Sequence, residues 1–320
     1  MKKRIISIVG LFALPVVLFL FFSLVAEGFG LHSIAIVISQ CMIPTIIGFA
    51  MCSVMNAGLM DFSPGARVVC GAVTGGLLSS SFGIAGLLIG CFAGGIIGAA
   101  IIGLLYRYLK IPSMVISLGI VLIFEVYGAK ITGSSGYVKI PNAISKVGSY
   151  PLNIVLTLIA GIILYIVFYQ TKIGFQIKAV GNDEKMAKSM GVKTDNVKFF
   201  AYLISGIFCG FGAILQICYS GSVTSSVGMA TMSMVFKPMM GVLIGLQLIR
   251  LVDNLPILIF IGELIIAIVF NGFIAMGLPD SVQNIVLGAF LLLVLGVSAN
   301  SASITKWRQR RIAGKVSISE

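Results

Sequence analysis

The sequence predicts an all-α, polytopic integral membrane protein with about ten transmembrane helices, and two observations carry this prediction. Hydrophobic residues make up 58% of the 320 residues and charged residues only 10%, against roughly a quarter charged in an average soluble domain. A soluble protein of this composition would expose large apolar patches, which are rare on soluble monomers. Long apolar segments also recur along the whole chain, so a soluble enzyme is disfavoured.

The apolar segments are of the length that a membrane-spanning helix needs, about 20 residues. They are apolar all round, whereas strands of a membrane barrel alternate in polarity over about ten residues. The segment 66–81 is short and rich in Gly and Ser, so a broken or re-entrant helix also fits it. The ten expected spans are Ile5–Ala26, Ser33–Met55, Ala66–Ser81, Ile84–Leu105, Ile111–Ile131, Pro151–Gln170, Phe199–Tyr219, Ser233–Val252, Leu255–Phe273 and Val282–Val297.

The first span is expected to be a retained helix. Basic residues precede it, as in a signal peptide, but its apolar run is about twice the length of a signal h-region. No small-residue cleavage site clearly ends it.

The basic residues predict the orientation. The chain carries 22 Lys and Arg against 10 Asp and Glu, a formal charge of +12. In a soluble protein this balance indicates nucleic acid, and in a membrane protein it reflects the excess of basic residues in cytoplasmic loops. With a cytoplasmic N-terminus and ten spans, 18 of the 22 lie inside and Lys130, Lys139, Lys146 and Lys237 outside. The inside set is Lys2, Lys3, Arg4, Arg67, Arg107, Lys110, the six Lys of 172–198, Arg250, Lys306, Arg308, Arg310, Arg311 and Lys315. Both termini are therefore predicted to be cytoplasmic, and no nucleic-acid partner is expected.

The sequence predicts no catalytic or metal site. All six Cys lie within expected spans without a CxxC pair, and buried Cys behaves as a small hydrophobe. His32 is the only histidine, and no nucleophile motif accompanies it. The chain also lacks a GxxxxGK[ST] phosphate-binding loop. It is therefore expected to bind no cofactor and not to be an enzyme.

Two carboxylates lie within expected spans, where they are costly and suggest function. Glu125 is near the outer end of its span, and Glu263 is nearer the middle of its own. Glu263 is a candidate to line a pathway or to pair with a neighbouring helix. For each residue a structural role is an equal alternative, and no cluster of Asp, Glu and His forms a proton relay.

The longest polar stretch is Thr171–Lys198. Asn182 or Asp183 is placed to cap a short helix, and Gly191 is placed to end it. Met186, Ala187 and Met190 fall on one face of that helix. Because so short a helix is unstable alone, it needs a surface to dock on. The alternative is a solvated loop.

Three motifs in this chain resemble those of one family. The first has the form TxxGxxxxAxGxNxxAAxxxGI and stands here as Thr171, Gly174, Ala179, Gly181, Asn182, Glu184, Ala187, Gly191 and Val192, with Lys185 and Met186 in the region where the family often has small residues. The other two are NAGLMDFSPGA at Asn56–Ala66 and NGFIAMGLPDSVQNIVLGAFLLLVL at Asn271–Leu295. They are similar to motifs of bacterial ABC importer permeases of the ribose/galactoside and branched-chain amino acid class. The region Lys237–Asn254 departs from the Gly-rich element that this family carries there.

The resemblance implies a single permease domain over 1–320 in the bacterial cytoplasmic membrane, with a cytoplasmic coupling loop at 171–198 and a cytoplasmic basic tail at 300–320. It implies a homo- or heterodimer of permease subunits, ATPase subunits that use ATP, and an extracytoplasmic substrate-binding protein. The expected solute is a monosaccharide, with nucleosides or branched-chain amino acids as alternatives. Alternatives of other classes are an ion-coupled secondary transporter and a membrane scaffold without transport.

The resemblance also names candidate sites. The expected ATPase-docking residues are Gly181, Asn182, Asp183, Glu184, Met186, Ala187, Met190 and Gly191. The expected translocation-path residues are Asn56, Asp61, Ser63, Glu263 and Asn271. An alternative for the segment 56–65 is a turn in which Asp61 caps a helix that starts with Pro64.

Overall fold

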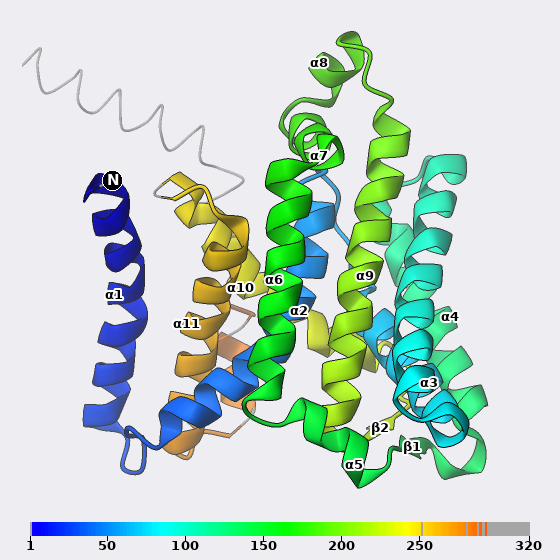
Figure 1. Cartoon of the computed structure of the whole chain (residues 1–320). Helices are drawn as coiled ribbons and strands as arrows, with labels where there is room; N and C mark the ends of the chain where they lie inside the picture. The colour runs from blue at the N-terminus through cyan, green and yellow to red at the C-terminus, as the bar shows by residue number, and fades with distance from the viewer. Residues whose placement is uncertain (1, 251, 280, 287, 290–291, 293–320) are drawn as a thin grey trace, which may run out of the picture.

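The chain forms a bundle of long helices that run between two ends (Figure 1). The computed structural model describes residues 2–250, 252–279, 281–286, 288–289 and 292. One end, called the α8 end, carries the short helices α7 (Lys172–Asn182) and α8 (Glu184–Ser189). The other, called the β end, carries α5 (Asn142–Ser145), β1 (Tyr137–Lys139) and β2 (Ser222–Thr224).

The long helices lie where the apolar segments predict them. Within the described residues, six are long and apolar enough to cross a membrane. They are α2 (Ser33–Met55), α3 (Pro64–Leu109), α4 (Ser113–Thr132), α6 (Leu152–Gln170), α9 (Thr194–Ser220) and α11 (Leu255–Ala275). The helix α1 (Lys2–Val25) has a shorter apolar part, Leu11–Val25.

Short elements connect these helices. They are the 3₁₀ turns η1 (Gly133–Ser135), η2 (Lys146–Gly148), η3 (Ala230–Met232) and η4 (Leu248–Arg250). The helix α10 (Ser233–Gln247) is shorter than the expected span Ser233–Val252, because η4 follows it directly.

Two expectations fall largely on residues outside the described set. The last expected span, Val282–Val297, lies only partly within it, and residues 281–286 are helical. The expected basic tail, 300–320, lies outside the described residues.

The two expected spans 66–81 and 84–105 are the two arms of α3. The arms are separated at Gly83, whose φ of 59° and ψ of −140° are not helical. Such a positive φ favours glycine, which lacks a Cβ. The arms fold back on each other through glycines, since a Cβ on Gly94 would lie 2.6 Å from the Cα of Gly71. The segment 66–81 is itself continuously helical, and the kink at Gly83 joins the two expected spans into a helical hairpin.

The helix α9 is the centre of the bundle and packs against both α2 and α3. It crosses α3 at a glycine contact, where a Cβ on Gly206 would lie 2.6 Å from the Cβ of Ala99 and 2.8 Å from the carbonyl oxygen of Gly95. Small residues allow helix backbones in a membrane to approach closely and gain van der Waals contact. At the β end, β1 pairs antiparallel with β2 through Val138 and Val223.

Replacing Gly206 with Ala should destabilise the protein by about 1–3 kcal/mol, because the methyl group overpacks the contact between α3 and α9. Gly119→Ala is the matched control: Gly119 lies in α4, and a Cβ there meets nothing within 4 Å. That control should leave stability unchanged or raise it by up to about 1 kcal/mol through helix propensity. Thermal unfolding in detergent measures both, and equal effects of the two variants would contradict the packing model.

Candidate functional site

The polar stretch after α6 is helical over most of its length. Thr171 caps α7, accepting a hydrogen bond from the Gly174 amide at 3.2 Å. Ile177 and Val180 of α7 are buried against the bundle, whereas Phe175 is exposed. The segment is therefore an amphipathic helix laid on the α8 end of the bundle, followed by the shorter helix α8.

The expected caps of the short helix are confirmed at Asp183 and Gly191. The carboxylate of Asp183 accepts a hydrogen bond from the Met186 amide at 3.0 Å, which satisfies a free N–H group of the first turn. Asn182 is the last residue of α7. Gly191 has a φ of 82°, and the next amide, of Val192, returns to the Ala187 carbonyl at 3.1 Å. This closes the C-terminus in the manner of a glycine cap.

Of the three residues expected on the apolar face of α8, one is buried against the bundle and two are exposed. Ala187 is only 3% exposed, whereas Met186 is 57% and Met190 73% exposed. Ala187 therefore packs α8 against the bundle, and the side chains of Met186 and Met190 project from the α8 end of the molecule. Flexible thioether side chains of this kind adapt to partner surfaces.

An ion pair fixes α8 to the bundle. The ammonium of Lys198, at the start of α9, lies 2.8 Å from a carboxylate oxygen of Glu184. It also donates a hydrogen bond to the Tyr106 hydroxyl of α3 at 3.2 Å. Lys198 is buried and Glu184 is about half exposed. These contacts join three elements, α8, α9 and α3.

The segment 56–65, expected as a pathway or turn element, lies directly beneath α7. A Cβ on Gly181 would overlap the carbonyl oxygen of Asn56 and lie 3.2 Å from the amide of Gly58. The Asn56 amide group itself donates to the Cys52 carbonyl at 2.8 Å. Two motifs that are 125 positions apart in the chain therefore meet in space.

A buried polar cluster follows in the same segment. The guanidinium of Arg67 lies 2.6 Å from the Asp61 carboxylate, and both side chains are fully buried. The other oxygen of that carboxylate accepts from the amide of Ser63 at 2.8 Å and from its hydroxyl at 2.6 Å. Arg67 also donates to the hydroxyls of Ser63 and of Ser205 in α9, at 3.0 Å each.

This cluster adds to one expectation and corrects another. Arg67 is counted in the sequence among the basic residues of the cytoplasmic side, and the structure shows it buried in the first turn of α3, paired with Asp61. Asp61 was considered as the cap of the following helix, whereas the capping position is Ser63, and Asp61 binds Ser63 and Arg67 instead. The signal that identifies such a residue is a lone Arg at the start of an apolar segment, six positions after an Asp.

The two membrane carboxylates differ in their surroundings. Glu125 accepts three hydrogen bonds, from the Met229 amide at 2.7 Å, the Thr231 amide at 2.8 Å and the Thr231 hydroxyl at 2.6 Å. These groups lie at the start of η3, which leads into α10, and a negative charge is favourable at such an N-terminus. Glu125 therefore holds the start of α10 in place, which is a structural role.

Glu263 has no such partners. Among the described residues, neither of its carboxylate oxygens has a hydrogen-bond partner, although the residue is only 1% exposed. It lines a cavity of about 250 Å³ together with Asn271, the other expected path residue of α11. Asn271 donates to the Ala267 carbonyl at 2.8 Å. The structure thus brings Glu263 and Asn271 together, and it places Asn56, Asp61 and Ser63 in the separate cluster beneath α7.

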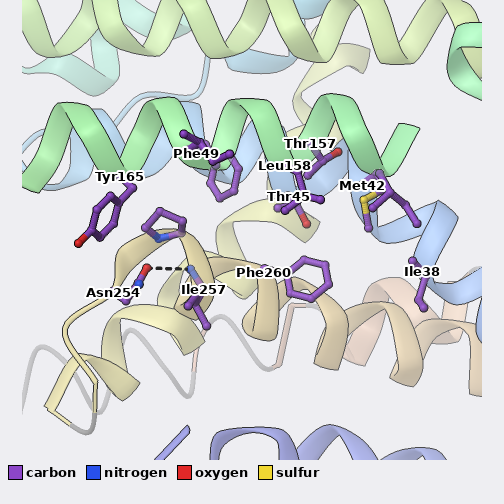
Figure 2. Close-up of a pocket in the computed structure, with 14 residues that line it drawn as sticks. Ile38, Met42, Thr45, Phe49, Thr157, Leu158, Tyr165, Asn254, Ile257 and Phe260 are labelled. Atoms are coloured by element: carbon purple, nitrogen blue, oxygen red, sulfur yellow. Dashed lines mark hydrogen bonds between the residues drawn. The ribbon is translucent and has the colours of Figure 1, made fainter. Parts of the chain in front are cut away.

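A second cavity, of about 390 Å³, lies between α2, α6 and α11 (Figure 2). Its lining is mostly aliphatic and aromatic, as Phe49 and Phe260 illustrate. The hydroxyls of Thr45 and Thr157 point to carbonyls of their own helices, at 2.7 and 2.9 Å. This groove offers few hydrogen bonds to a polar solute, so it is a poorer solute site than the Glu263 cavity.

These features define a class: a multi-pass helical membrane protein with a short helix, α8, that projects from one end of the bundle. The chain belongs to the family of permease components of branched-chain amino acid transport systems, whose model matches residues 33–295. It is therefore a transport component of a bacterial ABC importer, situated in the inner membrane.

Similar proteins are import permeases. The galactose/methyl galactoside import permease protein of Escherichia coli K12 is 27% identical over 60% of this chain, and the alignment spans 65% of that relative's length. The autoinducer 2 import system permease protein LsrD of Photorhabdus luminescens is 25% identical over 83% of each chain. The corresponding LsrC protein of Yersinia pestis is 21% identical over 90% of this chain and 76% of its own.

Replacing Arg67 with Met should destabilise the protein by about 3–5 kcal/mol, because the buried Asp61 carboxylate loses its countercharge. The double variant Asp61→Asn/Arg67→Met should recover much of this loss, since it leaves no buried charge. Unfolding of both variants and of the single Asp61→Asn variant, measured in the same detergent, gives the coupling between the two sites. Additive effects would contradict a direct ion pair.

Proposed function

We propose that this chain forms the translocation pathway of an ABC importer for a small monosaccharide-like solute. The galactose and autoinducer 2 import permeases to which it is similar support this class of solute. The partners we propose are ATPase subunits, a second permease subunit and an external substrate-binding protein. ATP is used by the ATPase, since this chain has no phosphate-binding loop.

The observation that carries the proposal is the construction of α8. A helix of six residues, capped at both ends and tied to α9 by the Glu184–Lys198 pair, presents two exposed methionines at one end of the bundle. We propose that Met186 and Met190 enter a groove of the ATPase, and that residues 181–191 form the docking segment around them. Ala187 then supports the helix from below and does not contact the partner.

The proposed topology has ten spans with both termini in the cytoplasm. The N-terminal end of α1 lies at the α8 end of the bundle (Figure 1), which supports an N-terminus on the same side as the docking helix. The outer residues Lys139 and Lys146 lie at or beside β1, α5 and η2, near the β end. The excess of cytoplasmic basic residues agrees with this orientation.

The proposed mechanism uses ATP to change the relative stability of two permease states. Closure of the ATPase dimer would move α8, and the rigid Glu184–Lys198–Tyr106 contacts would move α9 and α3 with it. ATP has this effect only if it stabilises one permease state more than the other. We propose that Asn56, Asp61 and Ser63 transmit this movement, and that Glu263 and Asn271 line the pathway.

Replacing Met186 or Met190 with Glu should abolish co-purification of the ATPase, or weaken it at least tenfold, because a charge would enter an apolar groove. Val227→Glu is the matched control, since Val227 is 58% exposed and follows β2 at the opposite end. This control should bind the ATPase normally. Ala187→Glu is unsuitable, because Ala187 is buried and its replacement would disturb the fold.

Unchanged ATPase association in both methionine variants would reject α8 as the docking helix. Uptake by vesicles that contain the permease without the ATPase would instead indicate an ion-coupled transporter.

A further inference from the structure

Glu263 is the polar group of the bundle whose environment is least explained. It lies at the ninth position of α11, a helix of 21 residues, and is 1% exposed. Neither carboxylate oxygen has a partner among the described residues. Buried polar groups in native proteins nearly always have hydrogen bonds, and Glu125 shows that this bundle can supply three to a carboxylate. An acid in a membrane that lacks such bonds suggests a functional site.

The bundle makes space for this carboxylate with two glycines. A Cβ on Gly48 of α2 would lie 3.1 Å from a Glu263 oxygen, and a Cβ on Gly241 of α10 would overlap the carboxyl group. The side chain therefore lies between the backbones of two neighbouring helices. Any side chain at position 241 would make the Glu263 carboxyl group shift.

The acid lines a cavity of about 250 Å³ between α2, α9, α10 and α11. Gln40 of α2, Lys237 of α10 and Asn271 of α11 line the same space, and Phe270 and Tyr219 add aromatic surface. The Lys237 ammonium lies 4.3 Å from the centre of the Phe270 ring. Tyr219 is at the end of α9 near β2, so the cavity extends from the Glu263 level toward the β end.

This lining selects for a small, neutral solute with several hydroxyl groups. It contains one acidic and one basic group and two amides, which together donate and accept hydrogen bonds. A carboxylate accepts strong hydrogen bonds from hydroxyl groups, and the aromatic rings provide a face for C–H groups. An apolar solute would leave the Glu263 carboxyl group without a hydrogen bond. The volume is below the roughly 300–1,000 Å³ of pockets for drug-sized ligands, so one small molecule fits.

We propose that this cavity is a solute-binding subsite contained within a single permease subunit, in which Glu263 accepts hydrogen bonds from the hydroxyls of a monosaccharide. The proposal rests on the proposed function, and it adds the residue that recognises the solute. It also predicts that each permease subunit carries its own subsite, because all the lining residues belong to one chain.

The test uses the complex of permease and ATPase in lipid nanodiscs, with radiolabelled D-galactose, D-ribose and L-leucine as probes. Glu263→Gln keeps the size of the side chain and replaces one carboxyl oxygen with an NH2 group, which cannot accept a hydrogen bond, so it should weaken sugar binding about 10- to 100-fold. Ala267→Leu fills the cavity from the same helix, one turn after the acid, and it should abolish sugar binding. Thr157→Val, in the apolar groove between α2, α6 and α11, is the control and should bind normally.

Co-purification of the ATPase with each variant reports whether the variant is folded and assembled. Sugar binding lost in both cavity variants while ATPase association is normal supports the subsite. Sugar binding within twofold of the unaltered protein in Glu263→Gln and Ala267→Leu overturns it and leaves the proposed function intact. Binding of leucine and of neither sugar overturns the solute class. Failure of the unaltered permease to associate with the ATPase overturns the proposed function itself.

Discussion

The buried pair between Asp61 and Arg67 holds the bundle in register. A charge in a membrane interior is tolerated when it is paired and hydrogen-bonded, and here Ser63 and Ser205 also accept hydrogen bonds from Arg67. Because Ser205 belongs to α9, the pair fixes the start of α3 against the central helix. The glycine contact between α3 and α9 depends on this alignment, since only a narrow range of positions brings Gly95 opposite Gly206.

The same alignment determines the position of the docking helix. The segment that carries Asp61 also carries Asn56 and Gly58, on which Gly181 of α7 is packed. Tyr106 at the far end of α3 meets Lys198, which binds Glu184 of α8. The 171–198 region therefore contacts the segment 56–65 at Gly181 and α3 at Lys198, and the Asp61–Arg67 pair holds both of these parts in place. A helix as short as α8, unstable alone, is ordered by these contacts.

Local features could be predicted from the sequence, and long-range pairing could not. The spans, the Asp183 cap and the Gly191 terminus depend on neighbouring residues, so composition and spacing identify them. The burial of Arg67 depends on Ser205, 138 positions away, and the role of Lys198 depends on Tyr106, 92 positions away. Glu125 and Glu263 look alike in sequence, but only one of them faces the N-terminus of α10. Their different environments arise from the packing of distant helices.

The helix α10 connects the docking region to the proposed solute subsite. At its start, a Cβ on Gly65 of α3 would overlap the Thr231 carbonyl of η3, so the turn near Asp61 packs directly on this end. Glu125 holds the same end through Thr231. Further along, Gly241 packs on the Glu263 carboxyl group. Closely packed interiors transmit strain from one element to the next. A shift of α3 that follows α8 would therefore move α10 as a unit and change the space around Glu263, provided that ATP favours one of its positions.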